Sequence, residues 1–273
     1  EDARVWKGGG RAVRNPDTEP VPRWLEELIL ATARHPTTAM VASAHIDAKD
    51  PTTIDGAGDC YFVLGIPWRG GFGRPLREMP EEGECFSPCG ASAFLRRDAF
   101  ERANGFDDSY FCYCEDVDLG FRMRLAGERC IFVPSAIVKH HGSAITGRYS
   151  DFTVRLGTRN RHRTYLTSMP PVALALTFPG HLLASFYLYV RTIGKPQCKA
   201  SREGIMDALR MMPDIIRRRK LVQKSRTISS ATLMRAMCFN VLQLHRRKPH
   251  IWWDRSYSPP TVSAMSTQHR LAW

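Results

Sequence analysis

Residues 86–143 read FSPCGASAFLRRDAFERANGFDDSYFCYCEDVDLGFRMRLAGERCIFVPSAIVKHHGS, and this stretch decides the fold. Apolar runs alternate in it with segments of helical spacing, and Asn104-Gly105 and Gly127 are helix stop signals. The predicted elements are, in order, a strand at 91–95, a helix at 97–103, a helix at 115–126 and two short strands at 130–133 and 136–138, split by Pro134. Alternating strands and helices of this kind indicate an α/β layer fold.

The segments before this stretch extend the same pattern. Residues 15–18 (NPDT) are a turn signal, and the helix that begins at Pro22 carries Trp24 on its apolar face. Residues 40–46 (MVASAHI) predict a buried strand. Residues 50–84 are rich in Gly, Pro and acids, which predicts a long loop with one short strand, and long loops often carry function.

The positive charge of the chain is concentrated at its carboxyl end. The 273 residues carry a net charge of +12, and residues 191–273 alone hold 17 Lys and Arg against 4 Asp and Glu. A composition of 43% hydrophobic residues excludes a disordered chain. A basic block usually meets phosphates, on nucleic acid or on a membrane surface. Trp252 and Trp253 lie close to Arg246 and Arg247, which keeps a nucleic-acid-binding protein as an alternative.

An uncharged segment precedes the basic block. Residues 164–190 contain no Asp, Glu, Lys or Arg across 27 positions, which is long enough to span a bilayer. Pro170-Pro171 and Pro179 interrupt it, so we expect a broken, interfacial or re-entrant helical pair rather than one straight spanning helix. Cations on both sides favour an anionic membrane surface. The alternative is a buried helical hairpin followed by a solvated basic helix.

Two groups of side chains suggest chemistry. Glu115, Asp116 and Asp118 fall at the start of a predicted helix, where a carboxylate either caps the helix or acts as a base toward a hydroxyl. His140-His141 supplies imidazoles that either ligate a divalent metal or serve a structural purpose.

Cysteine spacing leaves a zinc protein as a further alternative. Cys85-x3-Cys89 and Cys112-x-Cys114 could form metal pairs. Zinc sites usually repeat a tighter spacing in a second half-site, so we expect buried, reduced thiols instead.

Taken in order, these segments resemble inverting family 2 glycosyltransferases, and the rhamnosyltransferase-like branch most closely. The turn at 15–18 and the helix after it resemble the family's metal-binding turn. The other matching motifs are GASAFLRR at 90–97, GFD at 105–107, EDVDL at 115–119, Arg122, LAG at 125–127, VP at 133–134 and HHGS at 140–143. The resemblance covers residues 13–165 strongly and the basic helical tail more loosely.

The resemblance implies a role for each matching residue. Asp17 would be the metal-binding acid of an Asp-x-Asp-type motif in which Asn15 replaces the first acid, and both would meet the donor. His140 would be the later ligand of a divalent metal, Mg²⁺ or Mn²⁺. Asp116 would be the catalytic base, assisted by Glu115. The residues that would bind the acceptor or orient the base are Gly90, Ala91, Asp118, Arg122 and Arg159.

The resemblance also implies a fold and an activity. The family's GT-A fold begins with a strand and an Asp-bearing segment that grips the nucleotide, and residues 1–14 supply no such pair. We therefore expect a partial GT-A fold lacking its first strands in residues 1–150, and a helical, basic, membrane-associated region in residues 151–273. By itself this chain is expected to transfer little or no sugar, and an inactive truncated relative stays open.

The expected reaction of the family is metal-dependent and inverts the anomeric carbon. A sugar would pass from a nucleotide-diphosphate sugar donor to a lipid-linked or polysaccharide acceptor, in bacterial cell-surface glycan synthesis. The expected location is the cytoplasmic face of the inner membrane, at an anionic membrane surface, and nucleic acid is not an expected partner.

Overall fold

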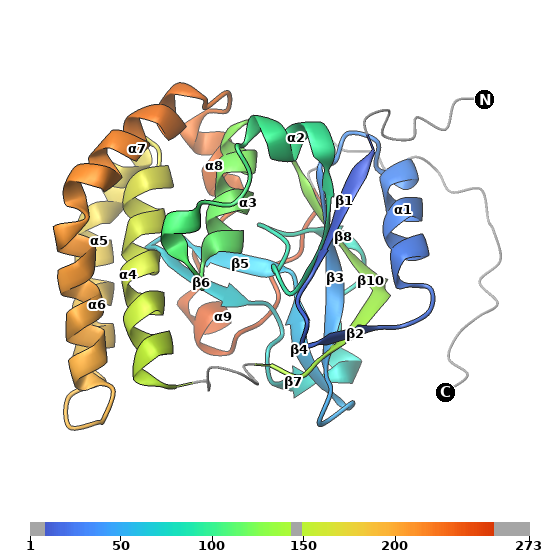
Figure 1. The fold of residues 1–273 in the computed structure, drawn as a ribbon, viewed down its shortest axis with the longest axis horizontal. Helices are drawn as coiled ribbons and strands as arrows, with labels where there is room; N and C mark the ends of the chain where they lie inside the picture. Colours follow the sequence, from blue (N-terminus) through green and yellow to red (C-terminus); the bar gives the residue numbers. More distant parts are fainter. Residues whose placement is uncertain (1–8, 143–148, 254–273) are drawn as a thin grey trace.

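The computed structural model describes residues 9–142 and 149–253, with a β-sheet region on one side and a group of helices on the other (Figure 1). The strands are β1 (Gly10–Arg14), β2 (Thr18–Pro20), β3 (Met40–Asp47), β4 (Thr53–Ala57), β5 (Asp59–Phe62), β6 (Ile66–Arg69), β7 (Arg74–Pro75), β8 (Gly83–Glu84), β9 (Ser92–Arg96) and β10 (Cys130–His140). The helices are α1 (Trp24–Arg34), η1 (Leu76–Glu78), α2 (Arg97–Arg102), η2 (Asp108–Tyr110), α3 (Glu115–Leu125), α4 (Asp151–Ser168), α5 (Pro171–Val190), α6 (Cys198–Arg210), α7 (Met212–Lys224), α8 (Ser230–Arg235) and α9 (Val241–His245). The predicted mixed α/β architecture is confirmed.

The main sheet has the strand order β1-β9-β3-β10-β2, with β4 and β7 continuing from β3, and β8 paired with β10. At its centre β3 and β10 are parallel, and Asp47 lies opposite His140. β2 runs antiparallel to β10 and pairs Thr18 with His140. This register places the turn that contains Asp17 beside the carboxyl end of β10.

Helices cover both faces of the central strands. Successive side chains of a strand point to opposite faces, and these strands carry apolar side chains on both faces. On one face, Trp24 and Leu28 of α1 pack with Val41, and the indole Nε1 of Trp24 donates a hydrogen bond of 2.8 Å to Ser43 Oγ. On the other face, Met40 belongs to a core that also holds Leu119 and Met123 of α3. The strand–helix alternation of the sequence therefore becomes a layered core, with α3 held against the sheet.

Two strand predictions are wrong. Residues 50–84 are not a long loop with one short strand, because they form β4 to β8 with η1 among them. These strands are two to five residues long, too short to give a clear period among Gly and Pro. Residues 130–133 and 136–138 do not form two strands but belong to the single strand β10. Pro134 does not end this strand, because it lies at a register shift where the hydrogen-bonded ladder is interrupted.

The amino end also contains a strand. Gly10–Arg14 forms β1, which runs antiparallel to β9, and Asn15 donates its backbone N–H to Ala91 O immediately after it. β1 carries no acidic residue. It leads directly into the turn that holds Asp17.

The predicted boundary between residues 150 and 151 coincides with the start of α4, where Ser150 caps the helix by accepting a hydrogen bond from Thr153 N. The helices after it are not independent of the sheet region. One core cluster combines Tyr61 and Phe121 with Tyr165 of α4 and Leu233 of α8. The division into two domains therefore stays a prediction.

The uncharged segment forms two helices, but not with the expected break. α4 ends at Ser168, and Pro170 precedes α5 as predicted, whereas Pro179 lies inside α5 without ending it. In the described part of the chain, α5 is the one helix long and apolar enough to cross a membrane. Only 17% of its most apolar window is buried, so the alternative of a buried hairpin is wrong.

Candidate active site

A cleft of about 660 Å³ opens where the ends of β1 and β10 meet the start of α3. Segments distant in the sequence supply its walls: the β1–β2 turn, strands β5 and β6, the residues before β9, and the loop that leads into α3. Seven predicted site residues line this cleft, and they are Asn15, Asp17, Gly90, Ala91, Glu115, Asp116 and His140.

His140 and Asp17 face each other inside the cleft. His140 Nε2 lies 3.4 Å from Asp17 Oδ2, and His140 Nδ1 lies 2.6 Å from Asp55 Oδ2 on β4. A carboxylate behind a metal-ligating imidazole typically orients the ring and fixes its tautomer, and Asp55 has that position here. A nitrogen lone pair opposite a carboxylate oxygen is a fitting pair of ligands for a divalent cation such as Mn²⁺.

Asp55 is a buried carboxylate that stays ionised. Burial by itself would raise the pKa of Asp55, but the hydrogen bond with His140 and the positive charge of Arg69 outweigh it and lower the pKa. Arg69 forms an ion pair with Asp55 and also lines the cleft. Sequence reasoning missed both residues because it treated their segment as loop.

Asp116 is held at the amino end of α3 by backbone groups. Its Oδ2 accepts a hydrogen bond of 2.7 Å from Gly90 N, and its Oδ1 accepts one of 2.8 Å from Val117 N. A Cβ on Gly90 would lie 3.0 Å from Asp116 Cβ, so glycine lets the two segments approach this closely. Backbone donors and a helix amino terminus both favour a negative charge here.

Glu115 differs from its neighbour although both line the cleft. Burial, with the negative charge of Asp116, raises the pKa of Glu115 to about 7. Its Oε2 is buried and has no hydrogen-bond partner among residues 9–142 and 149–253. Glu115 therefore exchanges its proton near neutral pH, beside a carboxylate that the backbone holds in place.

A further carboxylate of the cleft, Asp59, lies close to Asp116 and was also missed. Oxygens of Asp59 and Asp116 and the thiol of Cys89 lie within 4.8 Å of one another. Burial and the Asp116 charge raise the pKa of Asp59 well above its usual value. Two carboxylates this close disfavour each other's ionisation, which adds to the effect of burial on Asp59.

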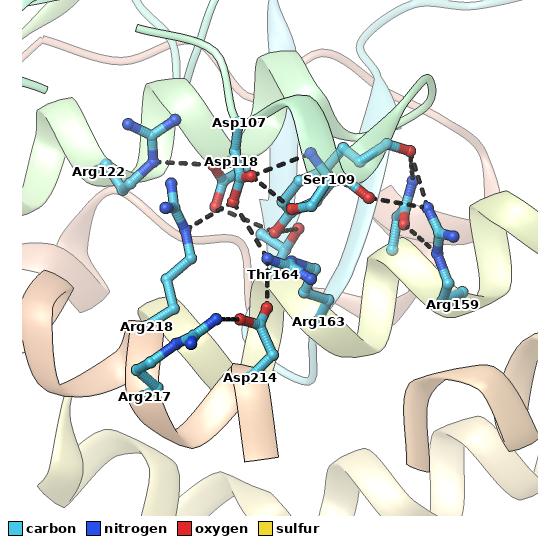
Figure 2. Close-up of polar contacts among 12 residues, drawn as sticks. Asp107, Ser109, Asp118, Arg122, Arg159, Arg163, Thr164, Asp214, Arg217 and Arg218 are labelled. Atoms are coloured by element: carbon cyan, nitrogen blue, oxygen red, sulfur yellow. Dashed lines mark hydrogen bonds and ion pairs between the residues drawn. The ribbon is translucent and has the colours of Figure 1, made fainter. Parts of the chain in front are cut away.

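Asp118, Arg122 and Arg159 do not line the cleft. Asp118 is fully buried, accepts a hydrogen bond of 3.0 Å from Tyr110 Oη and pairs with Arg122 at 2.8 Å (Figure 2). Arg122 also donates to the backbone oxygens of Ala103 and Gly105. These contacts orient the start of α3 from behind, whereas the direct contact with an acceptor expected of Asp118 and Arg122 has no counterpart in their placement.

The loop before α3 has a strained backbone. Phe111, Tyr113 and Cys114 have φ angles of 64°, 66° and 63°, a region that residues with a side chain seldom adopt. The buried amide of Asn160 secures this loop, with its nitrogen 2.8–3.0 Å from the carbonyl oxygens of Tyr110, Cys112 and Tyr113.

Arg159 adds to this attachment. It donates to the carbonyl oxygens of Ser109 and Tyr110 (Figure 2). Strain that several contacts maintain is typical of functional loops. Arg159 therefore contacts the loop that leads into the site, and not the cleft itself.

The basic run at residues 217–219 is mostly used inside the molecule. Arg218 pairs with Asp107 at 2.6 Å, and Arg217 pairs with Asp214 (Figure 2). Arg219 donates to the carbonyl oxygens of Leu166 and Met169. Arg218 and Arg219 therefore attach α7 to the loop before α3 and to the end of α4, whereas Arg217 pairs within α7 and is 79% exposed.

In the described residues, the group that could hold a metal, Asp59, Cys89 and Asp116, contains a single cysteine. Cys85 Sγ lies 3.3 Å from Cys130 Sγ, and both are buried free thiols. Cys89, Cys112 and Cys114 line the cleft as separate thiols. The expectation of buried or incidental thiols fits this arrangement.

Comparison with known proteins gives relatives in one family. The family described as "Glycosyl transferase family group 2" matches residues 27–190. An N-acetylglucosaminyl-diphospho-decaprenol L-rhamnosyltransferase of Mycobacterium tuberculosis is 34% identical over 157 residues, 52% of this chain and 50% of that protein. Rhamnosyltransferase WbbL of Escherichia coli is 46% identical over 52 residues, 19% of this chain and 20% of that protein. The chain thus spans about half the length of the first relative and a fifth of the second.

The fold has a counterpart among solved structures. The crystal structure of GalNAc-T7 with UDP, GalNAc and Mn²⁺ matches 83% of this chain and 39% of its own, with a TM-score of 0.50 and 13% identity. At this identity the likeness concerns the fold alone, and it supports a GT-A-like arrangement. The family match covers more than half of the chain, from α1 to the end of α5, and includes both Asp116 and His140. The chain is a member of glycosyl transferase family group 2.

Proposed function

We propose that this chain is part of the catalytic domain of a bacterial glycosyltransferase that moves a sugar, with inversion, from a nucleotide-diphosphate sugar to a lipid-linked or polysaccharide acceptor. One observation carries the proposal: Asp17 and His140, a pair suited to a cation, line the same cleft as Asp116. Inverting transfer needs both functions in one site, because a diphosphate must leave while a hydroxyl is deprotonated.

The names of the relatives support a more specific substrate pair. The Mycobacterium tuberculosis protein is named for transfer of L-rhamnose to N-acetylglucosaminyl-diphospho-decaprenol. We therefore propose a nucleotide-activated L-rhamnose as donor and a prenyl-diphosphate-linked sugar as acceptor. Such an acceptor is anchored in a membrane, so the proposed place of action is the cytoplasmic face of the inner membrane.

In the proposed mechanism, Asp17 and His140 would hold Mg²⁺ or Mn²⁺, which supplies positive charge to the departing diphosphate. Asp116 accepts the proton of the acceptor hydroxyl as that oxygen bonds to the anomeric carbon and the bond to the diphosphate breaks. Gly90 N and Val117 N keep the carboxylate in position through their hydrogen bonds. Asn15 and Ala91 are proposed to contact donor and acceptor.

The proposal is tested by Asp116→Asn in an active preparation that contains this chain. Removing the base while keeping its shape is expected to lower kcat about 10²–10⁴-fold with little change in donor KM. Asp108→Asn, an exposed carboxylate outside the cleft, is the matched control and is expected to keep the parent rate. A rate in Asp116→Asn equal to that of the control would remove Asp116 as the base.

The alternative of a nucleic-acid-binding protein rests on a tail of which several side chains have partners within the molecule. Arg218 pairs with Asp107, and Trp252 forms a β-bridge with Glu84 and packs on Arg124. The lipid-linked acceptor is therefore the partner to test first.

A further inference from the structure

Helix α5 turns its small and polar side chains inward and its large apolar ones outward. The buried positions recur every four residues, at Ala173, Thr177, His181 and Ser185. The exposed positions include Val172, Leu176, Leu183, Phe186 and Tyr187, each 59–73% exposed. A helix on a water-facing surface shows the opposite arrangement, so this outward face requires an apolar environment.

The polar stripe of α5 is attached to α4 along most of its length. Arg161 donates to Ser185 at 3.1 Å, His162 Nδ1 lies 3.0 Å from His181 Nε2, and the hydroxyls of Tyr165 and Thr177 are 2.8 Å apart. These partners are 24, 19 and 12 residues apart. The decreasing separation identifies an antiparallel hairpin that closes at Pro170.

This attachment argues against a membrane-spanning role for α5. The helix paired with it, α4, carries four arginines, at positions 155, 159, 161 and 163. Arginine side chains are costly in the hydrocarbon layer, so α4 cannot accompany α5 across a bilayer. Only the face of α5 that points away from α4 can therefore contact lipid.

The charges around this apolar face are positive, which favours binding to an anionic membrane surface. Residues 152–202 contain no Asp or Glu, and Arg191, Lys195 and Lys199 are exposed directly after the apolar face. An apolar helix face followed by cations matches the boundary between the acyl chains and the phosphates of an anionic membrane.

We propose that α5 lies in the plane of an anionic membrane surface, with Leu176, Leu183 and Phe186 inserted among the acyl chains and the three cations on lipid phosphates. This placement of α5 would hold the cleft near a lipid-linked acceptor, and in that respect the inference rests on the proposed function. Its tests use no sugar transfer, so docking and catalysis can fail separately.

The first test is flotation of the full 273-residue chain with phosphatidylcholine vesicles, with and without phosphatidylglycerol. Binding is expected only with phosphatidylglycerol, and Leu183→Ser with Phe186→Ser should weaken it about tenfold or more. The control pair is Leu25→Ser with Ile29→Ser, two residues of α1 that are 42% and 46% exposed. Circular dichroism checks that both variants are folded.

Three outcomes would overturn the proposal. The α5 variant could float as well as its control, or the parent could bind both kinds of vesicle equally. The third outcome concerns the oligomeric state, measured by sedimentation velocity. If the α5 substitutions convert a dimer into a monomer without changing flotation, this face joins two copies of the chain and does not bind the membrane.

A second test separates an in-plane helix from a spanning one. Leu176→Trp and Phe186→Trp place probes about 15 Å apart along the helix axis. An in-plane helix holds both probes at one shallow depth, so the added fluorescence of both should be quenched best by lipids brominated near the headgroup. Quenching of the two by lipids brominated at different depths would show a spanning helix and contradict the proposal.

Discussion

His140 and His141 are adjacent in the sequence but meet different surroundings, which gives a matched test of the metal site. His140 is buried between Asp17 and Asp55, whereas His141 is exposed and contacts Glu19 at 2.8 Å. We expect His140→Ala to weaken Mn²⁺ binding by about tenfold or more, measured by electron paramagnetic resonance of free Mn²⁺. His141→Ala should bind Mn²⁺ as the parent does, and equal effects of the two substitutions would remove His140 as a ligand.

The raised pKa of Glu115 predicts a pH dependence of the free energy of unfolding, which can be measured without substrate. Because the pKa of Glu115 is about 7 in the folded chain and near 4.5 when unfolded, the folded state holds the extra proton between these values. Stability attributable to Glu115 is complete below about pH 4.5 and falls as the pH rises through 7. Glu115→Gln removes this loss and should gain about 1–3 kcal/mol relative to the parent between pH 5 and pH 8.

Urea unfolding at the two pH values measures this difference for Glu115. Glu81→Gln, which replaces an exposed glutamate, serves as the control and should show no pH-dependent gain. If the parent and Glu115→Gln change in parallel between pH 5 and pH 8, Glu115 titrates normally and has no special proton affinity.

Among the elements, the loop that enters α3 depends on one side chain of α4. Asn160 is fully buried and contacts three carbonyl oxygens of a loop that includes three left-handed non-glycine residues. Asn160→Ala removes this donor from the carbonyl oxygens of Cys112 and Tyr113, while the Tyr110 oxygen still accepts from Arg159 and Cys112 N. The substitution should cost about 2–4 kcal/mol in the free energy of unfolding. Arg159→Ala removes a partly exposed donor to the same loop and should cost less than about 1.5 kcal/mol. Equal losses in urea titrations would mean that Asn160 has no special part in holding the loop.

Sequence patterns predict those helices and strands that are long enough to show their hydrophobic period. Strand β3 and helix α3 have 8 and 11 residues, and both were predicted within one residue of their bounds. Strands β5 and β6 have four residues each, so Asp59 and Arg69 had no pattern to identify them. Asp59 reaches Asp116 because β5 bridges to Ser87, a contact that no local periodicity encodes.

The family resemblance predicted more site residues than the cleft brings together. Resemblance to a family indicated Asp17, His140 and Asp116, and the cleft brings these three together while their roles stay predictions. The same resemblance suggested acceptor contacts for Asp118 and Arg122, which the structure pairs with each other away from the cleft. A matching motif marks a position in the chain but not the direction of its side chain. The i,i+4 spacing of Asp118 and Arg122 on the predicted helix is that of an ion pair, but spacing does not show that the pair is buried.

At the scale of the whole molecule, the sheet region and the later helices are expected to unfold together. Asp107, in the loop before α3, pairs with Arg163 of α4 and Arg218 of α7, and Tyr61 shares a core with Leu233 of α8. Breaking such a buried ion network by one partner costs about 3–5 kcal/mol. The two parts therefore share one core cluster and one ion network, and the division after residue 150 stays a prediction.

The measurement compares two probes during urea unfolding of the full chain. Near-ultraviolet circular dichroism reports aromatic packing, such as that of Trp24 against Ser43 in the sheet, and far-ultraviolet circular dichroism at 222 nm reports mainly the helices. Coincident curves are expected for one cooperative unit. Asp107→Asn should shift both curves together to lower urea, because it weakens contacts that join α7 to the loop before α3. Helices that survive after the near-ultraviolet signal is lost would instead establish residues 151–273 as a separate domain, and Asp107→Asn would then leave their transition unchanged.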